Sequence, residues 1–411
     1  MRALIREYLR IEKAILYVII AEFFLQIINS SFLSMLPLYM KEEGYTDGEI
    51  ADFTSYRFVG VVFLALFIGL YIRGRKVKHL FFISCICVPL FALLILYSIH
   101  LHNSSINYFA QILWGASFTF IQIPVVPFIL RNCKQEHHTG AIALSYATWS
   151  MAGIFSSIVF AFFGSMNPEL FSARNLLYAV SVSGFISLYF LFKMKITEHV
   201  PVITKKRSNI SDFDWGTISW VLIPTLIIAI GAGFTIPFIS LFFESVHGFS
   251  FSGFASVNLI ASVLIVMGAI LVPKIKQKIG YQIAIPTTQS FAIIALVLMA
   301  TTQFYNQLAI SAWIAVGCFL LRQPLMNLAG PMTTEVTMGY VGKRNQEMVS
   351  ALTASIWSGS WYFSAIMFRE LRNKHVDYAN IFMITAVLYT VGVVWYYFLV
   401  KEYNRKIKSE I

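Results

Sequence analysis

Residues 80–99 read LFFISCICVPLFALLILYSI, a stretch without a single charged side chain. About 20 apolar residues at 1.5 Å rise per residue are needed for a helix to cross roughly 30 Å of hydrocarbon. Eleven more stretches of similar character precede and follow it, separated by short polar breaks. The twelve predicted spans are 14–39, 49–71, 80–99, 107–130, 140–164, 175–194, 217–243, 252–272, 283–302, 308–330, 348–368 and 378–400. The sequence therefore predicts an all-α polytopic membrane protein with twelve transmembrane helices.

The overall composition agrees with this class. Of the 411 residues, 58% are hydrophobic and only 12% are charged, which is more apolar surface than a soluble domain could bury. The net charge of +11 could indicate a nucleic-acid partner, so the positions of the basic residues decide its meaning.

The basic residues are distributed unevenly between the two sides of the membrane. If the N-terminus is cytoplasmic, 24 of the 31 Lys and Arg residues lie in inner segments, five lie in outer segments and two lie within helices. This is the positive-inside bias, and it predicts a multi-pass protein of the cell (cytoplasmic, or inner) membrane with both termini in the cytoplasm. The charge orients the chain, so we expect no nucleic-acid partner.

Few residues suit metal binding or covalent catalysis. The four cysteines (Cys85, Cys87, Cys133, Cys318) lie within predicted helices or on the inner side, and the histidines fall in loops or near helix ends. We therefore expect no disulfide framework, no metal site and no cofactor. No nucleophile, metal cluster or carboxylate pair near one membrane face indicates an enzyme, and no ATP-binding glycine loop is present. Transport would have to draw on an ion gradient or on the solute's own gradient.

The longest polar break divides the chain into two similar halves. We expect a cytoplasmic interfacial segment at 1–13, helix bundles at 14–194 and 216–400, a linker at 195–215 and a cytoplasmic tail at 401–411. The halves repeat each other at offsets between 200 and 208 residues. Gly44-Tyr45-Thr46 matches Gly248-Phe249-Ser250, Gln122-Ile123-Pro124 matches Arg322-Gln323-Pro324, and LSYATWS at 144–150 matches LTASIWS at 352–358. Such internal repeats are typical of secondary transporters.

The loop after the second predicted span carries Gly74-Arg75-Lys76, and the fourth span carries Gln111-Ile112-Leu113-Trp114-Gly115. With the repeat, these motifs resemble the major facilitator superfamily of secondary transporters. The chain departs from the family pattern in lacking the aspartate of the loop signature and in having Gln111 where many members have arginine. The run from Arg322 to Arg344 also resembles a branch that includes many predicted drug exporters.

The resemblance implies two pseudo-symmetric six-helix bundles that rock about a central site between them, opening it to each side in turn. It also implies that Gly74, Arg75 and Lys76 act in gating.

Three charged residues, Glu22, Arg57 and Arg322, lie near the middle of their predicted spans, where an unpaired charge costs at least a few kcal/mol. Glu22, Gln26 and Asn29 are spaced to form one polar stripe on a helix. For Glu22 two interpretations stay open, a static ion pair with Arg57 and a proton site. An ion pair with Glu22 is likewise the structural alternative for Arg322, which otherwise would anchor the solute.

Asp52 is a second candidate for proton coupling. It lies about 140° around the helix from Arg57, which also suits a carboxylate at a gate or interface. Thr46-Asp47-Gly48-Glu49 fits a capping box at the start of its helix.

Aromatic and amide side chains within the spans complete the predicted site. The repeat-related pair Trp149 and Trp357 could form its wall, although tryptophan and serine there could equally serve helix packing. The predicted solute-binding residues are Gln26, Asn29, Arg57, Gln122, Trp149, Arg322, Gln323, Asn327, Trp357 and Trp361.

We therefore expect an alternating-access secondary transporter of a small organic solute, coupled to protons or another ion. Two arginines against one glutamate favour a solute with an anionic or hydrogen-bonding group. An exporter of drugs or amphipaths, and a lipid flippase on the same fold, stay open as alternatives. We expect the protein to act as a monomer among membrane lipids.

Overall fold

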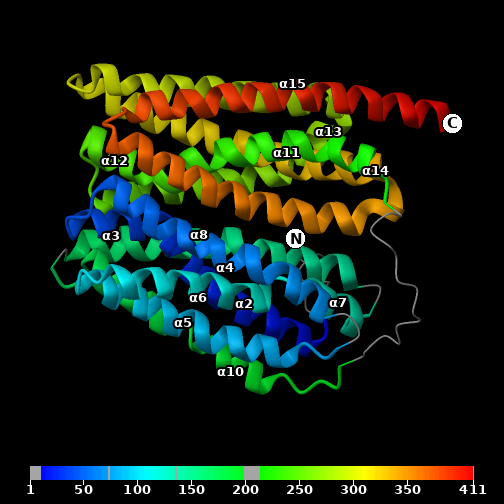
Figure 1. The fold of residues 1–411 in the computed structure, drawn as a ribbon, viewed down its shortest axis with the longest axis horizontal. Coiled ribbons are helices and arrows are strands. Elements are labelled where there is room, and N and C mark those ends of the chain that lie inside the picture. The colour runs from blue at the N-terminus through cyan, green and yellow to red at the C-terminus, as the bar shows by residue number, and fades with distance from the viewer. Residues whose placement is uncertain (1–10, 73–74, 135–136, 168, 199–212, 411) are drawn as a thin grey trace. The chain divides into compact units, whose positions relative to one another are not determined.

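A computed structural model describes residues 11–72, 75–134, 137–167, 169–198 and 213–410 (Figure 1). These residues form α-helices and two short 3-10 helices, without a β-strand among them. Most of the predicted interfacial segment and most of the predicted linker lie outside the described residues.

The chain divides into two compact units. Unit 1 comprises Met1–Thr46 and Phe53–Lys206, and unit 2 comprises Asp47–Asp52 and Arg207–Ile411. The first six residues of one helix, Asp47–Asp52, thus belong with unit 2 by their contacts, a feature that matters for the polar network described below.

The described part of unit 1 contains nine α-helices. They are α2 (Lys13–Ser34), α3 (Leu36–Glu42), α4 (Asp47–Tyr71, whose first six residues group with unit 2), α5 (Lys78–His100), α6 (Ser104–Gln122), α7 (Val125–Asn132), α8 (His138–Met166), α9 (Ala173–Ser183) and α10 (Ile186–Lys193). Three predicted spans are each divided into two helices, and proline lies at two of these breaks. Pro37 is the second residue of α3 and Pro124 directly precedes α7, which is expected because proline has no N–H to continue the helical hydrogen bonds.

Unit 2 contains longer helices. They are α11 (Trp215–Thr235), the 3-10 helix η3 (Ile236–Phe238), α12 (Ile239–His247), α13 (Phe251–Thr301), the 3-10 helix η4 (Thr302–Tyr305), α14 (Ala309–Asn373) and α15 (Tyr378–Glu410). Two of them are each interrupted by a glycine with positive φ, Gly280 in α13 (φ 66°, ψ 169°) and Gly342 in α14 (φ 70°, ψ 163°). Glycine adopts this conformation without the steric penalty of a side chain. Each interruption falls between two predicted spans, so α13 and α14 each supply two.

Within the residues that the structure describes, eleven helical segments are long and apolar enough to cross a membrane by length and composition. The remaining predicted span, 348–368, is helical as the second half of α14, but its serines and tryptophans lower its mean hydropathy. Together they account for the twelve predicted helices of an all-α polytopic membrane protein.

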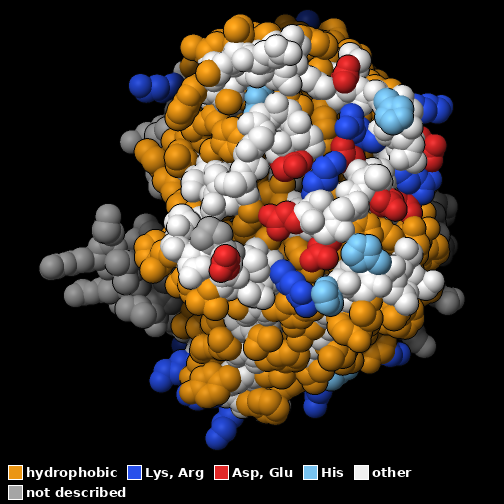
Figure 2. All heavy atoms as spheres, turned by 90° about the vertical axis from the view of Figure 1, so that its left-hand side faces the viewer, with side chains coloured by type: hydrophobic (Ala, Val, Ile, Leu, Met, Phe, Trp, Pro, Cys, Tyr) orange, Lys and Arg blue, Asp and Glu red, His pale blue; other side chains and the backbone are white. Residues whose placement is uncertain are grey.

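Large apolar side chains on the surface fit this class. Tyr146, Phe192 and Trp313 are each more than 70% exposed, which suits lipid better than water. Figure 2 shows apolar side chains flanking an area where acidic, basic and histidine side chains gather. Charged side chains thus concentrate on a limited part of the face in view.

Candidate functional site

The predicted polar stripe of helix α2 is present and buried. Glu22, Gln26 and Asn29 are 5%, 4% and 3% exposed, respectively. The Ser145 hydroxyl in α8 donates a hydrogen bond of 2.6 Å to the Glu22 carboxylate. Asn29 Nδ2 donates to Gln26 Oε1 at 3.2 Å, so the amides form a short chain along the helix. The stripe thus links α2 to α8 within unit 1.

Arg57 in helix α4 joins the other end of this stripe. Its Nη2 donates to Asn29 Oδ1 at 2.8 Å. The guanidinium carbon lies 4.7 Å from the ring centroid of Trp114 and 4.9 Å from that of Phe58, distances typical of cation–π contacts. In the described part of unit 1, no ion pair joins Arg57 to Glu22. The static ion pair considered from the sequence is therefore not the arrangement in this structure.

Close packing of α4 on α6 holds Arg57 in place. A Cβ on Gly115 would lie 1.9 Å from the Arg57 carbonyl oxygen, and one on Gly60 would lie 2.1 Å from the Ile112 carbonyl oxygen. Only glycine permits this approach of two backbones. The same crossing places Trp114 against the Arg57 guanidinium.

Arg322 is the buried cation of unit 2, in helix α14, and is 1% exposed. Its Nη1 lies 3.5 Å from Gln323 Oε1, at the outer limit of a hydrogen bond, and the Tyr389 side chain lies beside it. Its Nε and Nη2 have no hydrogen-bond partner among the described residues. No carboxylate of the described part of unit 2 forms an ion pair with it. The cation is thus buried without a matching anion in the part of unit 2 that the structure describes.

The other predicted binding residues are more exposed. Gln122 and Asn327 are exposed, and Asn327 donates to the Gln323 carbonyl oxygen at 2.8 Å. Trp149 in unit 1 is 43% exposed and Trp357 in unit 2 is 36% exposed. The rings of Trp357 and Trp361 lie edge to face with centroids 6.4 Å apart. The structure therefore brings the predicted residues into separate groups within each unit.

Two of the three predicted gating residues, Arg75 and Lys76, lie in the turn after α4. Gly74 is outside the described residues, Lys76 is exposed, and the Arg75 guanidinium lies 4.6 Å from the Tyr71 ring centroid. Arg131, at the end of α7, donates to the carbonyl oxygens of Arg75 at 3.2 Å and Ile72 at 3.1 Å. Sequence reasoning did not single out Arg131, because nothing along the chain relates it to this turn.

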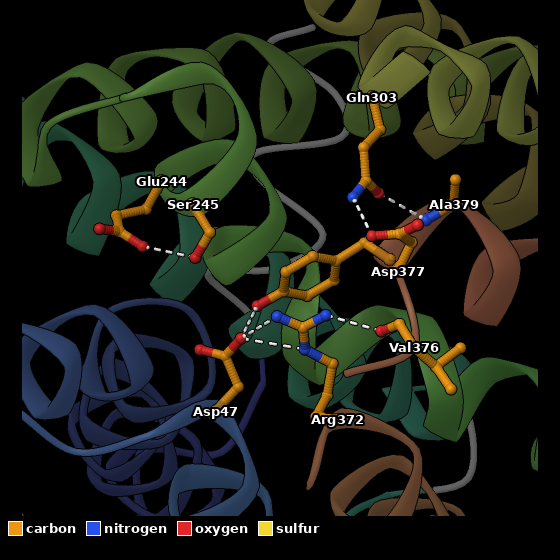
Figure 3. A network of polar contacts seen from close by, with 9 residues as sticks. Asp47, Glu244, Ser245, Gln303, Arg372, Val376, Asp377 and Ala379 are labelled. Atoms are coloured by element: carbon orange, nitrogen blue, oxygen red, sulfur yellow. Dashed lines mark hydrogen bonds and ion pairs between the residues drawn. The ribbon is translucent and has the colours of Figure 1, made fainter. Parts of the chain in front are cut away.

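A polar network at the start of α4 joins it to the end of α14 within unit 2 (Figure 3). The Asp47 carboxylate accepts hydrogen bonds from Arg372 Nη2 at 2.8 Å and Nε at 3.1 Å, and from the Tyr378 hydroxyl at 2.7 Å. Arg372 also donates to the Val376 carbonyl oxygen at 2.7 Å. The sequence indicated only a capping role for Asp47, because its partners are more than 300 residues away.

A second ion pair lies close by along the same two helices. Arg369 pairs with Asp52 and, at 2.9 Å, with Glu370. Asp52, which the sequence suggested for proton coupling or for a gate, is therefore engaged by an arginine. We call Asp47, Asp52, Arg369, Arg372 and Tyr378 the paired cluster.

Two further carboxylates accept hydrogen bonds near helix ends in unit 1. Glu198 accepts from the backbone N–H groups of Val77 at 2.7 Å and Lys78 at 2.8 Å, at the start of α5. Glu12 accepts from the Cys133 thiol and from the Lys134 N–H, both at 3.0 Å. Burial raises the pKa of the Glu12 carboxyl, but these hydrogen bonds outweigh burial and lower the pKa overall. Both carboxylates hold neighbouring chain segments together, away from the buried charges.

The folded chain resembles several solved transporter structures. A POT family transporter in complex with 5-aminolevulinic acid superposes with a TM-score of 0.73 at 11% identity, covering 96% of each chain. The D-xylose-proton symporter gives 0.71 at 11% identity, covering 93% of this chain and 95% of that one. A bacterial homologue of the iron transporter ferroportin gives 0.70 at 12% identity, covering 95% and 98%. At such identities the likeness shows the fold alone.

The sequence itself carries a family signal. No curated protein sequence matches the chain. The family model of the Major Facilitator Superfamily, however, matches residues 18–365, which include helices of both units. The fold and this match agree, and the chain belongs to the Major Facilitator Superfamily of membrane transporters.

Proposed function

We propose that this protein is a secondary transporter that carries a small organic solute by alternating access and couples its movement to protons. The observation that carries the proposal is the state of Arg322, buried in a membrane helix with two guanidinium nitrogens that meet no acceptor in the described residues. Each unmade hydrogen bond of a charged donor costs on the order of 1–3 kcal/mol or more. A residue this costly is retained for function more readily than for stability.

Arg322 would anchor the solute. Its guanidinium offers a planar set of donors that suits a carboxylate, a phosphate or vicinal hydroxyls. Its repeat partner, Gln122, is neutral, so the helix position does not itself require a charge. The solute would thus supply the acceptors that the protein lacks.

Glu22 would carry the proton. Its hydrogen bond comes from a serine hydroxyl, which can donate to a carboxylate or accept from a carboxylic acid. A carboxyl group held in this way can exist in either protonation state without leaving a buried charge pair broken. The proton symport of the D-xylose-proton symporter, a structural neighbour, supports the same kind of coupling here.

The paired cluster and the turn at Arg75 would act in gating. Asp52 is engaged by Arg369, which favours a latch over a proton carrier for this carboxylate. Ion pairs that form in one conformation and break in another are a common device of switching proteins.

We also propose the topology that the sequence indicates. Residues 1–13 would lie at the cytoplasmic interface, 14–194 and 216–400 would form the two bundles, and 195–215 and 401–411 would be the cytoplasmic linker and tail. The protein would act as a monomer, without enzymatic activity, in the cell membrane.

The test is reconstitution of the full chain in proteoliposomes that contain a pH-sensitive dye. Sugars, nucleosides, peptides and organic anions are added in turn, and solute-dependent proton movement is recorded for wild type, Glu22→Gln and Arg322→Gln. We expect one solute class to move protons in wild type and neither variant to support that movement. Transport of amphipathic dyes or of fluorescent lipids alone would favour the exporter or the flippase instead.

A further inference from the structure

Helix α6 carries a second polar stripe that the buried charges alone do not explain. Asn107, Gln111 and Trp114 are spaced so that they lie on one face of the helix. They are 1%, 1% and 2% exposed, respectively, so this face points into unit 1.

The polar side-chain atoms of this stripe form no hydrogen bonds with the described residues. Both side-chain polar atoms of Asn107, both of Gln111 and the indole N–H of Trp114 have no hydrogen-bond partner among the described residues. On the same helix, Ser117 and Thr119 donate to the carbonyl oxygens of Leu113 and Ala116, each at 2.6 Å. Hydroxyl groups here thus find partners within the helix, whereas the longer amides do not. Buried amides are normally satisfied, so a group that the protein does not supply is expected beside them.

Arg57 supplies a positive charge next to the stripe. Its guanidinium lies 4.7 Å from the Trp114 ring centroid, and Gln111 lies one helical turn from Trp114 on the same face. Its guanidinium donates a hydrogen bond to a neutral amide, Asn29, and no carboxylate in the described part of unit 1 pairs with it. A cation, two amide N–H₂ groups and an indole N–H therefore gather in one region of unit 1.

We propose that Arg57, Trp114, Gln111 and Asn107 form an anion subsite that binds the carboxylate of an organic acid, and that this acid is the transported solute. The inference rests on the proposed transport function and deepens it by naming the solute class. The donors would hold the carboxylate. The amide oxygens of Asn107 and Gln111 would accept from a hydroxyl group next to it.

Water alone would leave the positive charge of the Arg57 guanidinium without a counter-charge. Ordered water can satisfy buried amides, but it supplies no counter-charge for a guanidinium inside a membrane. A hydroxy acid supplies both the charge and the additional hydrogen bonds. The roughly 10 Å from Asn107 to Trp114 along the helix suits a small solute.

The test uses three matched probes on the full chain in lipid nanodiscs. Lactate has a carboxylate and a neighbouring hydroxyl, lactamide is its neutral counterpart, and propionate lacks the hydroxyl. The midpoint of thermal unfolding is measured against probe concentration. We expect lactate to raise the midpoint most, propionate to raise it less and lactamide to leave it unchanged.

Gln111→Met and Asn107→Leu remove the amides at nearly constant volume. Each variant should weaken lactate binding about tenfold or more, because hydrogen bonds to a charged group are lost. Neither should unfold at a lower temperature without probe, since an unsatisfied amide is removed. The matched control is Gln289→Met in unit 2, where a buried amide also has an oxygen without a partner, and it should bind lactate as wild type does.

Three results would overturn the subsite. They are wild-type lactate binding in both α6 variants, equal effects of lactate and lactamide, and the absence of any effect of the anions on wild type. If Arg322→Gln loses lactate binding while both α6 variants bind lactate as wild type does, the α6 subsite is refuted and the proposed function is left intact. If instead the α6 variants lose binding but no solute moves protons in proteoliposomes, the subsite stands and proton-coupled transport fails.

Discussion

Charged side chains in the paired cluster and in the interiors of the membrane helices differ in the partners that they contact. In the paired cluster, Asp47 and Asp52 each meet an arginine directly. In the helix interiors, Glu22 meets a serine, Arg57 meets an amide and aromatic rings, and Arg322 leaves two nitrogens unsatisfied. Charge thus meets opposite charge at the end of α14, whereas the charged groups in the helix interiors meet neutral groups, and only Arg322 among them leaves buried nitrogens without a partner in the described residues.

This difference in partners has opposite consequences for stability. An ion pair with additional hydrogen bonds stabilises the arrangement that contains it, so the paired cluster holds the residues Asp47–Asp52 to the end of α14 within unit 2. An unpaired buried charge destabilises the protein until something else neutralises or solvates it. The first pattern suits a latch, and the second suits a site that waits for a solute or a proton.

The largest effect is expected from Arg322. Arg322→Gln should reduce solute-dependent transport about a hundredfold or more, because a charge-assisted anchor is lost, and Arg322→Lys should restore only part of it, because the planar set of donors is missing. Uptake into proteoliposomes measures both. Arg174→Gln, at a half-buried arginine outside the predicted site, is the control and should transport normally. Normal affinity for the solute in both Arg322 variants would remove the anchor from the account.

Glu22 should show a more selective defect. Glu22→Gln keeps the hydrogen bond to Ser145 possible but cannot release a proton. Accumulation driven by a pH gradient should therefore be lost, whereas exchange of labelled for unlabelled solute should continue. Both are measured in the same proteoliposomes. A mutant that still accumulates solute against its gradient would show that the proton binds elsewhere.

The ion pairs of the paired cluster should give a measurable coupling free energy between their side chains. A double-mutant cycle of Asp47→Asn and Arg372→Gln should give a coupling of about 1–3 kcal/mol, because both side chains are largely buried. The control cycle, Arg369→Gln with Glu370→Gln, concerns a more exposed pair and should give roughly 0–1 kcal/mol. Chemical denaturation in detergent supplies the free energies of unfolding. Equal couplings in the two cycles would mean that the Asp47 network does not act as a latch.

The smallest effect is expected at the turn after α4. Arg75→Ala should slow turnover a few-fold with little change in equilibrium affinity, because this turn is held by Arg131 and does not touch the buried charges. Turnover is measured by transport and affinity by equilibrium binding. A large loss of affinity at unchanged turnover would point to a role in binding rather than in gating.

The sequence predicted the helices well because each membrane-spanning helix needs an apolar stretch of about 20 residues, which is visible in the sequence. It placed the breaks at Gly280 and Gly342 between spans, and it found the stripe of Glu22, Gln26 and Asn29. It predicted α2 and α3 as one helix, because a single proline at 37 does not disrupt an apolar run.

The contacts between distant helices were beyond the reach of the sequence. Nothing along the chain relates Asp47 to Arg372 or Arg131 to Arg75, and Asp52 and Arg369 are likewise far apart in the sequence. The unused amides of Asn107 and Gln111 could be noticed as polar residues in a membrane span. Their lack of partners, however, becomes visible only when the neighbouring helices are in place.

Thermal unfolding of Arg322→Gln and Arg372→Gln, measured side by side in nanodiscs without solute, tests the contrast between unpaired and paired charges most directly. Opposite outcomes are expected for the two variants. Arg322→Gln should unfold at the same temperature as wild type or higher, because an unsatisfied buried charge is removed, and Arg372→Gln should unfold at a lower temperature, because Asp47 loses its partner. If Arg322→Gln is destabilised as much as Arg372→Gln, Arg322 is a structural residue and the distinction between a waiting site and a latch is contradicted.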